Sequence, residues 1–209
     1  MNGLSTQLIR IAYEHGLFPM GSETGEVGWY QPFERALFPI EGIHVSRSLA
    51  KVLRRVRFGD PADADPITLT VTFDRAFEDV MRGCLRPQDN WITEEIITGF
   101  CAVHDEGWAH SCEVWLDGRL VGGTYGVAIG SCFSAESMFH RAADASKVAL
   151  WAMVNRCREL GFTIFDAQIM NPHLKSLGAF EQPQAEYLES LRTAMRRQTP
   201  WSRLPLYSN

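Results

Sequence analysis

The amino-acid sequence predicts an α+β fold in which a mostly antiparallel sheet is flanked by helices. Three strand-like segments follow one another, joined by the turn signals Asp117-Gly118 and Ile129-Gly130, a pattern typical of an antiparallel meander. Segments with helical periodicity precede and follow this meander. With 209 residues, 45% of them hydrophobic and 11% aromatic, the chain can bury one large core, or a main core and a small satellite domain.

The N-terminal part begins with a predicted helix, which Ser5 caps and Gly16 ends. A loop rich in glycine and glutamate follows over residues 21–28, and a strand-like segment over residues 36–40. These elements predict a small N-terminal domain or arm.

A basic amphipathic helix is predicted over residues 46–58, because apolar residues recur there at i, i+3, i+4 and i+7. Its basic side chains lie on the other face or just behind it: Arg47, Lys51, Arg54, Arg55 and Arg57. A solvated face is one explanation of such a run. The chain has a net charge of -5, however, so a segregated basic cluster also indicates contact with nucleic-acid phosphates.

An exposed linker with three aspartates and two prolines is predicted over residues 59–66. We therefore expect a boundary between a small N-terminal domain (1–62) and a larger domain (63–209). The larger domain should contain strands over 68–73, 109–116, 119–129, 132–139 and 163–167, and helices over 76–84, 93–106, 144–160 and 184–197. Asp144 should cap the long helix and Gly161 should end it.

Asp166 and Gln168 form the first candidate constellation, because they alternate along a short predicted strand and should project to the same face. Their neighbours are apolar, so a carboxylate here is expected to be partly buried and to need a partner. Glu136, at the end of another strand, offers a second partly buried carboxylate. A structural ion pair is one interpretation; the other is a site that recognises a cation and orients an amine nucleophile.

An apolar stripe on the long helix, Leu150, Met153 and Cys157, is the second constellation, with Phe133 available from the preceding strand. Core packing is the favoured interpretation, since helices dock through such stripes. A cavity bordered by this stripe would instead suit an unbranched or aromatic apolar side chain.

Several function classes have little support in the sequence. The five cysteines are odd in number and scattered, which indicates neither a disulfide framework nor a zinc site, and the six histidines show no metal spacing. No serine lies in a Gly-x-Ser-x-Gly motif. A signal peptide and a membrane span are not predicted, so we expect a protein of the cytoplasm without metal or membrane partners.

Ordered sequence blocks run along nearly the whole chain and resemble those of one family. They are YEHGLFPM (13–20), HVSRSL (44–49), NWI (90–92), AHSCEVW (109–115), LVGGTYGVA (120–128), ESMFHRAADASK (136–147) and DAQIMNPHLKSLGA (166–179). With this many blocks in order, the chain resembles the leucyl/phenylalanyl-tRNA–protein transferases.

The resemblance implies a small N-terminal domain followed by a domain similar to the GNAT acetyltransferase fold. Family members move Leu or Phe from aminoacyl-tRNA to an N-terminal Arg or Lys, marking the recipient protein for degradation, without a metal or coenzyme. Asp166 and Gln168 match the family's catalytic pair, Glu136 a site carboxylate, and Trp91 a residue near the terminal adenosine. On this basis Gln168 would orient the amine, while Asp166 would fix Gln168 and add negative potential.

The resemblance also implies an aminoacyl pocket made by Phe133, Leu150, Met153 and Cys157, and a basic helix that holds the tRNA acceptor stem. Many members carry Trp where this chain has Met20, and a more apolar residue where it has Thr124. Larger apolar residues are also common at Met153 and Cys157. The expected pocket is therefore wider and less aromatic, which would shift the preference between Leu and Phe or admit Met.

Two alternatives remain open from the sequence. The first is a non-catalytic module that binds tRNA or N-terminal degrons. The second is a coenzyme A-dependent acetyltransferase. Asp144 is evidence against it, because the Asp144 carboxylate would occupy the place of the coenzyme's pyrophosphate at the start of the long helix.

Overall fold

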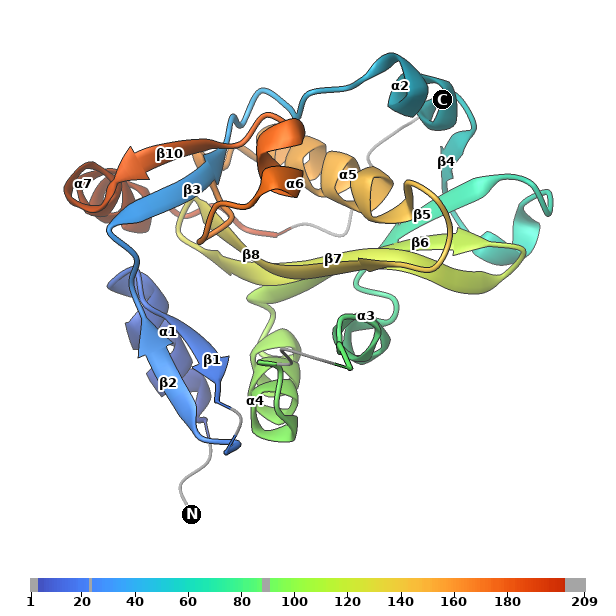
Figure 1. Ribbon diagram of the computed structural model, residues 1–209. Helices are drawn as coiled ribbons and strands as arrows, with labels where there is room; N and C mark the ends of the chain where they lie inside the picture. The colour runs from blue at the N-terminus through green and yellow to red at the C-terminus, as the bar shows by residue number, and fades with distance from the viewer. Residues whose placement is uncertain (1–3, 23, 88–90, 202–209) are drawn as a thin grey trace.

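The computed structural model describes residues 4–22, 24–87 and 91–201, and it has the predicted α+β architecture. An eight-stranded sheet has the strand order β10-β3-β9-β8-β7-β6-β5-β4, and a separate two-stranded sheet pairs β1 with β2 (Figure 1). The strands are β1 (Phe18–Gly21), β2 (Val27–Tyr30), β3 (Glu34–Phe38), β4 (Val56–Phe58), β5 (Leu69–Phe73), β6 (Ala109–Leu116), β7 (Arg119–Ile129), β8 (Cys132–His140), β9 (Ile164–Asp166) and β10 (Phe180–Pro183).

The predicted meander of β6, β7 and β8 is confirmed, with both pairs antiparallel. Asp117 and Gly118 join the first pair with φ of 52° and 68°, the left-handed conformation that suits a tight hairpin turn. β9 then runs parallel to β8, and β4 runs parallel to β5. The remaining pairs are antiparallel, so the sheet is mostly antiparallel as expected.

Helices cover both faces of the large sheet (Figure 1). The helices are α1 (Thr6–Glu14), α2 (Arg47–Leu53), α3 (Phe77–Gly83), α4 (Glu94–Asp105), α5 (Ala145–Leu160), α6 (Pro172–Ser176) and α7 (Gln184–Met195), with a short 3₁₀ turn at Pro61–Asp63. The long helix α5 packs on one face and α3 and α4 on the other. Among the described helices, none has the length and apolarity needed to cross a bilayer.

The ends of the long helix confirm one prediction and correct another. Gly161 ends α5 in the left-handed conformation (φ 86°), as the sequence predicts. Asp144 precedes α5, but its side chain does not cap the helix. With φ of 63° the residue is left-handed, and its carboxylate accepts a hydrogen bond from Lys147 Nζ at 2.6 Å instead.

The N-terminal 62 residues contain more strand than the sequence predicts. The expected loop over residues 21–28 lies largely within a hairpin, since β1 ends at Gly21 and β2 begins at Val27. The basic helix is shorter than predicted, because the chain leaves α2 after Leu53 to form β4 beside β5. β3 and β4 are strands of the large sheet, and the division at residue 62 stays a prediction.

Two short elements near the C-terminus are absent from the prediction. Asn171 caps α6 by accepting a hydrogen bond from the Leu174 amide at 2.9 Å, and Pro172 occupies its first turn. β10 follows as the edge strand beside β3. These elements matter for function, since α6 contributes to the cavity described next.

Candidate active site

A cavity of about 210 Å³ lies where β1, β8, the segment after β9 and α6 meet. Its lining combines apolar and polar side chains from distant parts of the chain. The lining residues are Phe18, Met20, Phe38, Arg86, Trp91, Thr124, Ala135, Glu136, Ser137, Met138, Leu150, Ala167, Gln168, Ile169, Asn171 and Leu174. Six sequence-predicted site residues are therefore brought together here, namely Met20, Trp91, Thr124, Glu136, Leu150 and Gln168.

Gln168 is held in a strained backbone conformation rather than on a regular strand. β9 ends at Asp166, and Gln168 has φ of 55°, so the predicted strand alternation does not explain its position. Hydrogen bonds fix its main chain: its carbonyl accepts from the Ala36 amide (3.0 Å) and its amide donates to Asp166 Oδ1 (2.9 Å). Its side-chain Nε2 donates to Glu136 Oε1 (2.8 Å), which leaves its Oε1 as the acceptor in the cavity.

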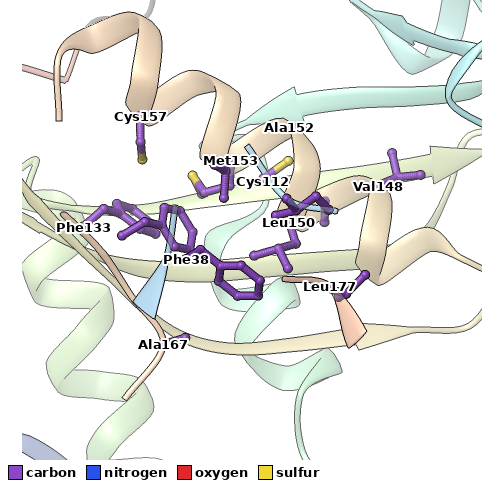
Figure 2. Packing of buried hydrophobic residues seen from close by; sticks show 14 of the residues in the cluster. Phe38, Cys112, Phe133, Val148, Leu150, Ala152, Met153, Cys157, Ala167 and Leu177 are labelled. Carbon is purple, nitrogen blue, oxygen red and sulfur yellow. The ribbon is translucent and has the colours of Figure 1, made fainter. Parts of the chain in front are cut away.

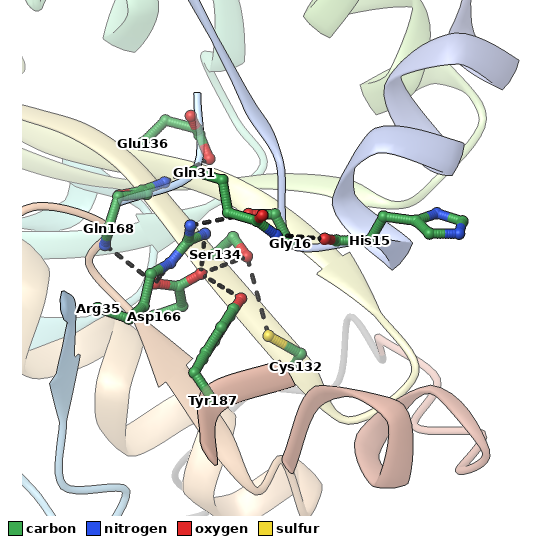
Figure 3. A network of polar contacts seen from close by, with 10 residues as sticks. All are labelled: His15, Gly16, Gln31, Arg35, Cys132, Ser134, Glu136, Asp166, Gln168 and Tyr187. Carbon is green, nitrogen blue, oxygen red and sulfur yellow. Dashed lines mark hydrogen bonds and ion pairs between the residues drawn. The ribbon is translucent and has the colours of Figure 1, made fainter. Parts of the chain in front are cut away.

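Asp166 lies beneath this site and is completely buried (Figure 3). Arg35 donates to both carboxylate oxygens, from Nε to Oδ1 (2.8 Å) and from Nη2 to Oδ2 (2.6 Å). The hydroxyls of Tyr187 (2.8 Å) and Ser134 (3.3 Å) also donate to Oδ2. Asp166 therefore supports Gln168 through the main chain, and Arg35 neutralises the negative potential that the sequence led us to expect from Asp166.

Arg35 and Tyr187 belong to the site network although the sequence analysis did not single them out. Arg35 is buried, donates from Nη1 to the Gly16 carbonyl (2.9 Å), and has its guanidinium over the rings of Phe18 and Tyr187. Burial lowers its pKa, but the charge and hydrogen bonds of Asp166 outweigh this effect and raise it overall. A lone arginine before three apolar strand residues was the available signal, because such a charge needs a buried partner.

Glu136 owes its position to an irregularity of the sheet. Ala135 pairs with Gly126 and Ser137 with Tyr125, so Glu136 is an extra residue with no counterpart in β7. Such bulges redirect side chains, and they are frequent next to active sites. Burial raises the pKa of Glu136 to about 8; hydrogen bonding to Tyr13 opposes this shift and the nearby Asp166 charge adds to it.

The chain is similar to the members of one protein family over most of its length. The model described as leucyl/phenylalanyl-tRNA protein transferase matches residues 37–192, and the model of the N-terminal domain of the same protein matches residues 2–32. A leucyl/phenylalanyl-tRNA–protein transferase from Chlorobaculum tepidum is 44% identical over 189 residues, covering 88% of this chain and 92% of the relative. Another from Rubrobacter xylanophilus is 43% identical, covering 92% and 96%. The chain belongs to the leucyl/phenylalanyl-tRNA–protein transferase family.

Solved structures show only a distant similarity to this member of the transferase family. A GCN5-related N-acetyltransferase-like protein from Streptococcus suis matches with a TM-score of 0.36 and 14% identity, over 85% of this chain and 64% of that one. A C-terminal domain of a putative lysylphosphatidylglycerol synthetase from Agrobacterium fabrum matches with a TM-score of 0.39 at the same identity, over 83% of this chain and 55% of that one. Neither similarity is strong enough to inform the mechanism of the transferase.

The apolar wall of the transferase cavity differs from the expected pocket. Leu150 lines the cavity, but Phe133, Met153 and Cys157 do not, because all three are completely buried in the core between α5 and the sheet (Figure 2). The favoured core-packing interpretation therefore describes these three residues. Met138, which the sequence analysis did not include, lines the cavity in their place.

The five basic residues of the transferase's α2 region are all exposed: Arg47, Lys51, Arg54, Arg55 and Arg57. Leu49, on the opposite face of α2, is buried in the core. Just before α2, the His44 amide donates to the Leu177 carbonyl (2.8 Å) at the end of α6. Because α6 also contributes Leu174 to the cavity, the basic surface and the cavity are joined through this short helix.

Away from the transferase cavity, ligand atoms of Asp74, His104 and His110 lie within 4.8 Å of one another. Sequence spacing gave no sign of this group, because its members come from the segment after β5, from α4 and from β6. Asp74 Oδ2 lies 3.0 Å from His110 Nδ1 and Asp74 Oδ1 accepts from the Ser111 amide (3.0 Å). These contacts tie Asp74 to β6, and the expectation of a site without metal stays a prediction.

Proposed function

We propose that the protein transfers leucine or phenylalanine from aminoacyl-tRNA to the α-amine of an N-terminal Arg or Lys of another protein. The product carries a new N-terminal residue that marks it for degradation, and the reaction takes place in the cytoplasm without a coenzyme. The observation that carries this proposal is the cavity itself, in which the Gln168 amide and the Glu136 carboxylate face apolar side chains such as Leu150 and Met138.

The chemistry of this reaction fits a site built for positioning. An aminoacyl ester is already activated, so aminolysis needs an oriented amine and the exclusion of water rather than an enzyme nucleophile. The free Oε1 of Gln168 can accept a hydrogen bond from the attacking amine, and its strained backbone is fixed by Asp166 and Ala36. The donor side chain would lie against the apolar wall, in which Met20 stands where the resemblance implies Trp in many members and Thr124 where it implies a more apolar residue.

Acceptor selectivity would come from charge. Asp166 is paired with Arg35 and does not line the cavity, whereas Glu136 does. An acceptor with a cationic N-terminal residue brings positive charge to this carboxylate, whereas a neutral one brings only its α-ammonium.

Binding of the tRNA would use two surfaces joined by α6. The exposed side chains of Arg47, Lys51, Arg54, Arg55 and Arg57 would contact phosphates of the acceptor stem. Trp91 lines the cavity and would stack on the terminal adenosine, a contact that aromatic side chains commonly make with nucleic-acid bases.

The test is a transfer assay with radiolabelled leucine, phenylalanine or methionine on charged tRNA, and with peptides that begin with Arg, Lys, Ala or N-acetylated Arg. We expect transfer to the Arg and Lys peptides and none to the acetylated peptide, which has no free amine. Equal transfer to the Ala peptide would contradict the proposed acceptor, and absence of transfer with tight tRNA binding would favour the non-catalytic module.

A further inference from the structure

Aminolysis at this site needs a group that takes up a proton. The α-amino group of a peptide has a pKa of about 7.7–8.0, so it is largely an ammonium ion at neutral pH and cannot attack an ester. Two carboxylates are close enough to the reacting position to serve, Asp166 and Glu136, and both contact Gln168. Their surroundings distinguish them.

Asp166 is unsuited to proton transfer with a substrate. Its carboxylate already accepts two hydrogen bonds from Arg35, one from the Gln168 amide, and one each from the Tyr187 and Ser134 hydroxyls. The side chain is completely buried between β3 and β8 and does not line the cavity. Both the access and the free lone pair that a base requires are missing.

Unlike Asp166, Glu136 is accessible from the cavity. It lines the cavity, and its Oε1 accepts the Gln168 Nε2 hydrogen bond at 2.8 Å. The same amide group presents its own oxygen to the cavity, so an amine held by Gln168 Oε1 lies next to the Glu136 carboxylate. We propose that Glu136 is the general base that deprotonates the acceptor's α-ammonium, while Asp166 acts only through the position of Gln168.

The step balances without any further reactant. The ammonium gives one proton to the Glu136 carboxylate, and the resulting amine attacks the ester carbonyl of the aminoacyl-tRNA. A carbon–nitrogen bond forms, a second amine proton passes to the ribose oxygen, and the carbon–oxygen bond breaks to release a tRNA hydroxyl. Glu136 then returns its proton to water.

The protonation equilibrium of Glu136 is consistent with this role. Its pKa is raised to about 8, chiefly by burial, which is close to the pKa of the amine that it must deprotonate. Proton transfer is efficient when donor and acceptor are matched in this way near the working pH.

The test is the rate of a single turnover at saturating Arg peptide between pH 6 and pH 9.5, for the wild type and for Glu136→Gln. A glutamine can still accept the Gln168 hydrogen bond through its amide oxygen, so the substitution removes the base and keeps the contact. We expect a loss of roughly six- to elevenfold at pH 7, because only about one sixth to one eleventh of an α-amine with a pKa of 7.7–8.0 is unprotonated there. The loss should shrink as the pH rises above the pKa of the amine, because the free amine then forms without a base.

Two further variants make the outcome unambiguous. Glu136→Asp keeps a carboxylate and should keep part of the rate with the wild-type pH dependence, while Glu181→Gln removes an exposed carboxylate on β10 and should change nothing. A Glu136→Gln rate within threefold of wild type, a loss that is independent of pH, or an effect confined to the KM of the peptide would overturn the role. Because this role rests on the proposed function, wild-type transfer is measured first; its absence would count against the function itself.

Discussion

At the scale of single residues, the buried pair of Arg35 and Asp166 organises the site. Both side chains are essentially unexposed; the Tyr187 hydroxyl also donates to Asp166, and Arg35 also donates to the Gly16 carbonyl. Burying two charges carries a desolvation cost, so such a pair is weak evidence of stability by itself. Its effect here is positional, since Asp166 fixes the Gln168 main chain.

Removing one member of this pair should destabilise the protein. Asp166→Asn leaves the Arg35 guanidinium buried without its counter-charge, so we expect the free energy of unfolding to fall by about 3–5 kcal/mol in urea titrations. Ser134→Ala removes only the 3.3 Å hydrogen bond to the same carboxylate and should cost about 1 kcal/mol. An Asp166→Asn protein as stable as Ser134→Ala would show that the pair does not bear on folding.

The raised pKa of Glu136 predicts a pH-dependent stability. A carboxyl whose pKa rises from 4.5 in the unfolded chain to about 8 in the folded one favours folding most below pH 4.5, and this contribution is lost as the pH rises through 8. Raising the pH from 5 to 9 should therefore lower the stability of the wild type relative to Glu136→Gln by on the order of 1–4 kcal/mol. Urea unfolding at pH 5 and at pH 9 measures the free energy of unfolding of both proteins. A difference between the two proteins that is the same at both pH values would contradict the prediction.

The sequence predicted some site residues and not others for a physical reason. Gln168 and Glu136 could be found because polar residues within apolar strand segments stand out locally. Arg35 and Tyr187 meet Asp166 across 131 and 21 positions, and a single sequence gives no distance over such separations. The bulge that orients Glu136 depends on the register with β7, which is likewise a long-range property.

At the scale of secondary-structure elements, the apolar stripe of α5 belongs mostly to the core, and of its three residues only Leu150 lines the cavity. Met153 and Cys157 pack in the core and do not line the cavity, whereas Met20 and Thr124 do. Changes at the two kinds of position should therefore have different consequences.

Larger residues in the core should destabilise without selecting a donor. We expect Cys157→Phe to lower the free energy of unfolding by about 1–3 kcal/mol through overpacking, with the ratio of leucine to phenylalanine transfer unchanged. Met20→Trp should instead narrow the cavity and shift that ratio. Transfer assays with both charged tRNAs, together with urea unfolding, measure the two effects; a shifted ratio in Cys157→Phe alone would place the aminoacyl pocket at α5.

Charge reversal on the α2 region should weaken tRNA binding. The double variant Arg54→Glu with Arg55→Glu should raise the Kd for tRNA and flatten the dependence of log Kd on log salt, because fewer counterions are released. Arg192→Glu with Arg196→Glu makes the same charge change on exposed side chains at α7, at the opposite end of the molecule, and should have little effect (Figure 1). Filter binding at several salt concentrations distinguishes them, and equal effects would rule out a specific basic surface.

Elements with strong local signals were predicted well. Ser5 caps α1, Gly161 ends α5, and Asp117 with Gly118 forms the first turn of the meander, each through a backbone preference that the residue type carries. The short strands β1, β2, β4 and β10 were missed, because three or four residues acquire strand structure only from a partner elsewhere in the chain.

At the scale of the whole molecule, distant segments close the site together. The Gly21 amide at the end of β1 donates to the Trp91 carbonyl (2.8 Å), and a Cβ at Gly21 would come within 2.7 Å of that carbonyl oxygen. β3 lies between β10 and β9, so residues preceding the expected boundary at 62 support the strand that ends at Asp166. The cavity is thus a product of the complete fold rather than of one segment.

The central claim is that aminoacyl transfer takes place at Gln168, in a cavity that lies apart from the exposed basic residues of the α2 region proposed to contact the acceptor stem. The most direct measurement is to determine, on one preparation of Gln168→Ala, both the rate of leucine transfer to an Arg peptide and the Kd for tRNA. We predict a loss of transfer of at least about 100-fold with a Kd within about twofold of wild type, since Gln168 lies away from the exposed α2 residues. Transfer at the wild-type rate would contradict the claim, and so would a loss of transfer fully explained by a loss of tRNA binding.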